Sequence, residues 1–140
     1  MTTSPRALLD ARLRTLTSEC EASCALVVDT SGQDYGASDL PPDWQRLVRD
    51  VEPLVAAATR EHPLRSGGHL HLVRSVEPPF VAAESFAGVY MLLVLFDGAF
   101  AASAVTALVR RALPEIEALT VTQPPPDPSE EAGAARMRRA

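Results

Sequence analysis

Apolar residues recur along the first twenty positions of the chain at the spacing of an amphipathic helix. They lie four, three and four residues apart, with charged residues largely between them, and are Leu9, Leu13, Leu16 and Cys20. Pro5 follows Ser4 and suits the first turn of a helix, where its missing amide is not needed. The pattern predicts a helix that starts at Pro5 and buries one stripe.

The next segment has the pattern of a hairpin followed by a second helix. A short apolar run at 24–28 predicts a strand, and Thr30-Ser31-Gly32 turns the chain back toward residues 33–37. Pro and Asp then cluster in SDLPPD, which marks a helix start. The apolar positions of this second helix are Trp44, Leu47, Val48, Val51, Leu54, Val55 and Ala58. Pro53 lies inside it and should kink or restart it.

Three further strands and a last helix complete the pattern. HLHLVRSV alternates and predicts a half-exposed strand, FVAAESF predicts a fourth strand, and the unbroken apolar run VYMLLVLF predicts a strand covered on both faces, at the sheet centre. Helical spacing returns after Ala101 and ends near Leu119, with Pro114 as another expected kink. Because hairpins join most strands, we expect an α+β domain with a mainly antiparallel sheet and helices on its faces.

The C-terminal segment QPPPDPSEEAGAARMRRA has no apolar period and is rich in Pro, Glu, Ala and Arg. Such a composition cannot bury enough apolar surface to offset the entropy of ordering the chain. We therefore expect one folded domain over residues 1–122, followed by a disordered tail at 123–140.

Composition narrows the class of protein. The 140 residues are 46% hydrophobic, which suits a single core. The net charge of -5 lacks the excess of positive charge that is typical of nucleic-acid-binding proteins. All 13 basic residues are Arg and Asn is absent, which indicates a GC-rich bacterial genome. The N-terminus lacks the profile of a signal peptide, and Asp97-Gly98 interrupts the longest apolar region, so we expect a cytoplasmic protein without membrane insertion. Cys20 and Cys24 are expected to be buried and reduced.

One aspartate invites a catalytic interpretation. Asp29 lies in VVDTSG, which is close to the motif of aspartic proteases, and a short chain could supply one carboxylate of a catalytic pair from each copy of a dimer. In that family, however, Gly directly follows the Thr or Ser, whereas Ser31 intervenes here. Asp and Gly are also favoured at the first and fourth positions of a type I turn. The pattern therefore favours a hairpin corner.

The other candidates for chemistry are weaker. His69 and His71 share a strand face and offer two metal ligands, but no third ligand is clearly placed, and solvent-facing residues account for them. His62 suits a helix end. The sequence has no G-x-S-x-G motif and no phosphate-binding loop. We assign no catalytic residue, cofactor or metal ligand from the sequence.

The order of elements and the segments CALVVDTSGQDYGAS, VYMLLVLFDGAF and VTALVRRALPEIEAL resemble the roadblock/dynein light chain family over roughly residues 5–119. The resemblance implies a five-stranded antiparallel sheet with one helix on one face and two on the other. It also implies a non-catalytic scaffold or regulator of small Ras-like GTPases, in bacteria associated with polarity and motility. Such domains pair with themselves or with a paralogue through sheet edges and second helices.

Two features of the residues fit such pairing. The HLHLVRSV strand has few of the charges or prolines that blunt a sheet edge, and the second helix is apolar around more than one stripe. We predict a dimer interface at Trp44, Leu47, Val48, Val51, Leu54, Leu70 and Leu72, although Trp44 also suits the core. Arg46 and Arg49 share a helix face and are the predicted contacts to a GTPase. The alternatives are a dimeric hydrolase that uses Asp29 and a small domain that binds a ligand between sheet and helix.

Overall fold

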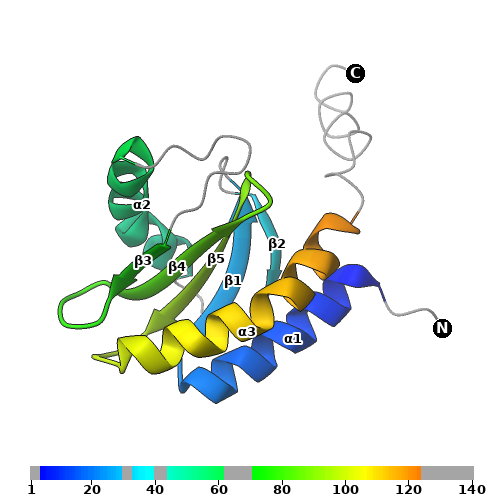
Figure 1. The fold of residues 1–140 in the computed structure, drawn as a ribbon, viewed down its shortest axis with the longest axis horizontal. Coiled ribbons are helices and arrows are strands. Elements are labelled where there is room, and N and C mark those ends of the chain that lie inside the picture. The colour runs from blue at the N-terminus through cyan, green and yellow to red at the C-terminus, as the bar shows by residue number, and fades with distance from the viewer. Residues whose placement is uncertain (1–3, 30–32, 40–43, 62–70, 124–140) are drawn as a thin grey trace.

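Five strands form one sheet, and helices cover both of its faces (Figure 1). The computed structural model describes residues 4–29, 33–39, 44–61 and 71–123, apart from the side chains of Trp44, Leu47 and residues 58–61. The elements in chain order are α1 (Pro5–Cys20), β1 (Cys24–Asp29), β2 (Asp34–Ala37), α2 (Trp44–Glu61), β3 (His71–Arg74), β4 (Phe80–Phe86), β5 (Tyr90–Phe96) and α3 (Ala102–Val121). This is the order predicted from the sequence.

The sheet is antiparallel throughout, with the strand order β2-β1-β5-β4-β3. β5 is the central strand, and its five residues from Met91 to Leu95 are all buried. The prediction that VYMLLVLF forms the sheet centre is confirmed, because only a strand with helices on both faces buries every side chain in succession. β2 and β3 are the two edge strands.

Two helices, α1 and α3, lie side by side on one face of the sheet, and α2 lies alone on the other (Figure 1). The apolar stripe of α1 is buried as predicted, and α3 buries Val105, Val109, Ala112, Ile116 and Thr120. The Ser4 hydroxyl accepts a hydrogen bond from the Ala7 amide at 3.1 Å and so caps α1 at its expected start. The α+β fold with helices divided one and two is therefore confirmed.

Both helices that contain an internal proline continue through it. Pro53 lies within α2 and Pro114 within α3, and both are exposed. A proline on the solvent side costs less, because water can bond the carbonyl that has lost its helical partner. The expected restart of the second helix is therefore not observed.

Some predicted features lie outside the described residues. They are the hairpin turn at 30–32, the segment 62–70 with His62, His69 and Leu70, and the tail from 124 to 140. The predictions for these residues stay as predictions. Among the described residues, no helix is long and apolar enough to cross a membrane.

Candidate protein-interaction site

The outer side of α2 presents the two arginines predicted to bind a partner. Arg46 and Arg49 are both exposed, and they lie three positions apart on the helix. The opposite side of the helix packs on the sheet through Val51, which is only 1% exposed, with Val48 and Val55 beside it. The helix therefore presents its arginines to solvent and its valines to the sheet.

The described side chains of α2 cover the sheet only in part. Among the described side chains, α2 contributes one buried residue, Val51, whereas α1 contributes four and α3 contributes five. Val48, Leu54 and Val55 are only half-buried. Partly covered apolar side chains that cluster on one side of a domain are typical of a protein-binding surface.

The edge strand β3 adjoins this surface. Leu72 is half-buried and packs with the core residues on the α2 side of the sheet. Of the predicted interface residues, Val51 is buried within one copy of the chain, so it positions α2 on the sheet. The side chains of Trp44 and Leu47, and the whole of Leu70, lie outside the described residues.

A buried carboxylate holds β3 on the opposite face of the sheet. Glu84 of β4 lies directly across from His71 in the strand register and is 1% exposed. Its carboxylate contacts Nδ1 of His71 and lies 3.6 Å from Nε of Arg110 on α3. Sequence analysis did not identify this cluster, although Glu84 is the one charged residue in the apolar run FVAAESF. A buried glutamate with two basic neighbours joins three elements at the edge of the sheet.

Asp29 belongs to the β1–β2 hairpin in the structure. Its Oδ1 accepts a hydrogen bond from the Gln33 amide at 3.1 Å, and its Oδ2 accepts one from the Tyr35 hydroxyl at 2.9 Å. Both carboxylate oxygens therefore stabilise the return of the chain into β2. This arrangement agrees with the hairpin interpretation of VVDTSG.

The two cysteines are buried on opposite faces of the sheet. Cys20 packs among the residues under α1 and α3, and Cys24 packs among those under α2. Burial, assisted by the negative charge of Glu19, raises the pKa of the Cys20 thiol to about 11. At neutral pH this thiol stays protonated, which makes it a poor nucleophile.

A hollow of about 430 Å³ lies where the end of α1 meets the connection from β5 to α3. Phe96 and Phe100 stack with their ring centroids 3.9 Å apart in its wall. Glu19, Glu21 and Asp97 also line it. The hollow is thus both aromatic and acidic, and it lies on the α1 and α3 side of the sheet, away from α2.

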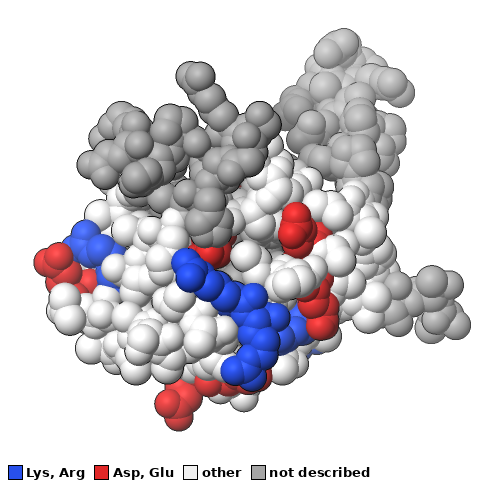
Figure 2. Space-filling view, viewed as in Figure 1, with Lys and Arg blue, Asp and Glu red and all other residues white. Residues whose placement is uncertain are grey.

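Figure 2 shows a side of the molecule that includes α1 and α3, on which a band of basic side chains crosses the middle, with acidic groups on both sides. The exposed arginines of these two helices include Arg14, Arg110 and Arg111. Because both signs of charge are present on this face, it lacks the uniform basic surface of a nucleic-acid-binding protein.

The fold identifies a structural class. No protein-family model matches the sequence, and no curated protein matches it. The solved Roadblock/LC7 domain from Streptomyces avermitillis superposes with a TM-score of 0.57 at 16% identity, over 76% of this chain and 96% of that chain. The protein therefore has a roadblock-like fold, as the sequence resemblance implied.

Within that class the protein is similar to MglB structures. The gliding protein MglB from Thermus thermophilus gives a TM-score of 0.67 at 19% identity, over 86% of this chain and 93% of that chain. A structure described as MglB with a tetrameric arrangement gives the same TM-score at 18% identity, over the same shares of the two chains. At these identities the similarity establishes the fold alone.

Proposed function

We propose that the protein is a non-catalytic, dimeric scaffold or regulator that binds a small Ras-like GTPase, or a regulator of one, in the bacterial cytoplasm. The roadblock-like fold is the observation that carries this proposal. The likeness to a protein named for gliding supports a role in cell polarity or motility. The protein would contribute a binding surface, because GTP hydrolysis depends mainly on positioning and charge stabilisation that the GTPase itself can largely supply.

The proposed dimer joins two copies, or this chain and a paralogue, through β3 and α2. The half-buried residues Val48, Leu54 and Leu72 support this choice, because a partner would remove their remaining apolar surface from water. Trp44, Leu47 and Leu70 are proposed contacts from the sequence. The tetrameric arrangement of an MglB supports self-association of the fold.

Sedimentation at increasing concentration tests the dimer. We expect the wild-type protein to sediment as a dimer and Leu72→Arg to weaken the association at least tenfold while keeping its circular dichroism spectrum. Val121→Arg is the matched control, because Val121 is a 49% exposed apolar residue on α3, away from the proposed interface. A wild-type monomer at high micromolar concentration would contradict the dimer.

Calorimetry tests the GTPase surface after a pull-down from the native lysate has identified the GTPase. Changing Arg46 and Arg49 to Ala should weaken binding by about 1–3 kcal/mol if the two guanidinium groups contact the partner. The matched control changes Arg14 and Arg111, which are exposed on α1 and α3. Unchanged affinity for the Arg46/Arg49 variant, with dimerisation intact, would remove this side of α2 from the contact.

The hydrolase alternative has its own test. Asp29→Asn keeps a side chain of the same shape and removes the carboxylate that acid–base catalysis requires. We expect the variant to fold and to bind its partners as the wild type does. Peptide cleavage by the wild-type protein that the variant loses would overturn the scaffold proposal.

A further inference from the structure

The second edge strand, β2, lies at the end of the sheet opposite β3. An edge strand presents backbone N–H and C=O groups to the outside, and these groups can pair with a strand of another chain. Just after β2 the Ser38 amide donates to the Ala25 carbonyl of β1. Because antiparallel residues alternate between bonded and unbonded pairs, the backbone groups of Ala37 point away from β1. Tyr35 lies where the register of the two strands shifts, and its carbonyl bonds outside the sheet.

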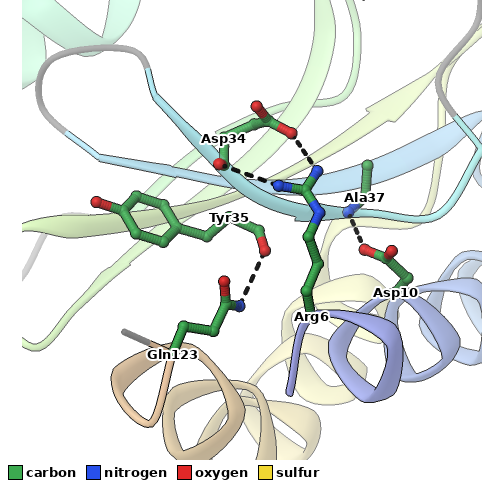
Figure 3. A network of polar contacts seen from close by, with 6 residues as sticks. All are labelled: Arg6, Asp10, Asp34, Tyr35, Ala37 and Gln123. Carbon is green, nitrogen blue, oxygen red and sulfur yellow. Dashed lines mark hydrogen bonds and ion pairs between the residues drawn. The ribbon is translucent and has the colours of Figure 1, made fainter. Parts of the chain in front are cut away.

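One side chain of α1 and one just after α3 bind these outward groups (Figure 3). Oδ1 of Asp10, on α1, accepts a hydrogen bond from the Ala37 amide at 2.8 Å. Nε2 of Gln123, just after α3, donates to the Tyr35 carbonyl at 2.9 Å. Both contacts occupy main-chain groups that an added strand would need.

An ion pair covers the start of the same strand. Nη2 of Arg6, on α1, lies 2.5 Å from Oδ2 of Asp34, and Nη1 of Arg6 lies 3.5 Å from the Asp34 carbonyl. We call Arg6, Asp10 and Gln123 the β2 latch. Arg6 and Asp10 come from the first helix and Gln123 follows the last, and the three reach three of the four residues of β2.

Gly36 of β2 allows α1 to approach the strand closely enough for the latch contacts to form. A Cβ atom on Gly36 would lie 2.7 Å from Cδ2 of Leu9 and 3.1 Å from Oδ1 of Asp10. Leu9 is fully buried, so a Cβ at Gly36 would have to displace packed core atoms. The absence of a side chain at Gly36 thus brings α1 close enough to β2 for the Asp10 carboxylate to reach the Ala37 amide.

We propose that the β2 latch closes this edge of the sheet to strand addition, and that an opened edge pairs with β2 of a second copy of the chain. The closed edge follows from the contacts above, whereas its effect on the assembly rests on the dimer proposed above. Two copies joined at β3 form a longer sheet that ends in β2 on both sides. If both ends were open, identical edges would pair repeatedly and build an open polymer, so the latch limits the assembly to two copies.

The second copy is the partner that the geometry favours. Each β2 edge carries the same four-residue strand, so two copies meet as antiparallel, self-complementary strands related by a two-fold axis. Once Asp10 is replaced, the Arg6–Asp34 pair leaves one charge of each sign at the edge, and so no net charge to attract a charged partner.

The test frees the two main-chain groups and follows the mass of the full-length protein. Sedimentation of Asp10→Ala/Gln123→Ala is expected to show a weight-average mass that rises with concentration to at least twice that of the wild type. Asp10→Asn is the control, because its amide oxygen still accepts from the Ala37 amide and should keep the wild-type mass. If the double variant does not fold, each single change frees one group and is measured in the same way.

A cross-link locates the association. Asp34→Cys and Ser38→Cys are placed separately in the double variant, and the two proteins are mixed. They should form a disulfide with each other under oxidation, because antiparallel strands that pair Tyr35 with Ala37 place residue 34 of one copy opposite residue 38 of the other. A folded double variant with the wild-type mass at every concentration would overturn the proposal. So would a rise in mass without the cross-link, because the association would then lie elsewhere.

The two proposals fail in different ways. A wild-type protein that is a monomer contradicts the dimer, but the latch then predicts that the double variant becomes a dimer. A wild-type dimer whose double variant stays a folded dimer contradicts the latch and leaves the proposed function standing.

Discussion

The Tyr35 hydroxyl donates a hydrogen bond to Oδ2 of Asp29 at 2.9 Å, across the hairpin that joins β1 to β2. The Tyr35 ring also packs edge-on against Tyr90 of β5, with the ring centroids 5.1 Å apart. One side chain thus links the hairpin to the central strand. Burial, together with the bond to Asp29 and its negative charge, raises the pKa of Tyr35 to about 12.

This pKa predicts a loss of stability in alkali. Since the folded protein holds the Tyr35 proton more tightly than the unfolded chain, the stabilisation is complete below the ordinary tyrosine pKa of about 10. It is lost as the pH rises from there through about 12. Tyr35→Phe should therefore show a shallower fall in unfolding free energy than the wild type, measured by urea denaturation at increasing pH.

Cys20 must be controlled in that experiment, because its raised pKa of about 11 contributes a slope of the same sign. The comparison is therefore made in a Cys20→Ala background. If the unfolding free energy of the two proteins falls equally with pH in that background, the pKa of Tyr35 is not raised by folding.

Gly36 is predicted to be intolerant of a side chain. Gly36→Ala places a methyl group against the buried Leu9 and should cost about 1–3 kcal/mol of unfolding free energy through overpacking. Gly98→Ala is the matched control, because a Cβ there has no neighbour within 4 Å. Chemical denaturation of both variants measures the difference, and equal stabilities would contradict the close approach of α1 to β2.

Glu84 is predicted to stabilise the attachment of β3. Glu84→Gln keeps the shape of the side chain but removes the charge that faces His71 and Arg110, and it should cost about 1–3 kcal/mol. Arg110→Ala should cost less, because the Arg110 side chain is 56% exposed and water screens its attraction. Urea denaturation of the three proteins gives this ranking, and the reverse order would contradict it.

Removal of the tail is predicted to leave the domain intact. The truncation should follow Gln123, because its side chain bonds to the Tyr35 carbonyl, whereas residues 124–140 have no apolar period. We expect the melting temperature and the sedimentation coefficient, corrected for the lost mass, to match those of the full-length chain. A truncated protein that melts several degrees lower would show that the tail packs on the domain.

Most of the helices and strands could be predicted from regular patterns of apolar residues. The stripe from Leu9 to Cys20 has the spacing of a helix that packs one side on a sheet. The run from Met91 to Leu95 is apolar at every position, as in a strand covered on both faces. Such periods are local, so they can be recognised without knowledge of the partner element. The continuous α2 could not be predicted, because the cost of Pro53 depends on whether its side of the helix meets water or protein.

The polar contacts have no comparable local pattern. Asp10 and Ala37 are 27 residues apart, and Gln123 and Tyr35 are 88 residues apart. Asp10 within α1 and Gln123 just after α3 would each be ordinary in solvent, and only the sheet topology shows that a strand edge lies within reach. The predicted contacts Arg46 and Arg49 are exposed, but exposure alone does not identify a partner.

The anchoring of β2 also brings the start of α1 close to the end of α3. Arg6 and Gln123 lie at the two limits of the domain, yet they bond to the consecutive residues Asp34 and Tyr35 (Figure 3). The start of α1 and the end of α3 are therefore neighbours, and a linker of a few residues would turn the domain into a nearly closed ring. A circularly permuted chain, in which the elements follow one another in a different order, would then keep the same architecture. The tight turn at Ala87 and Gly88 between β4 and β5 is a suitable site for the new chain ends.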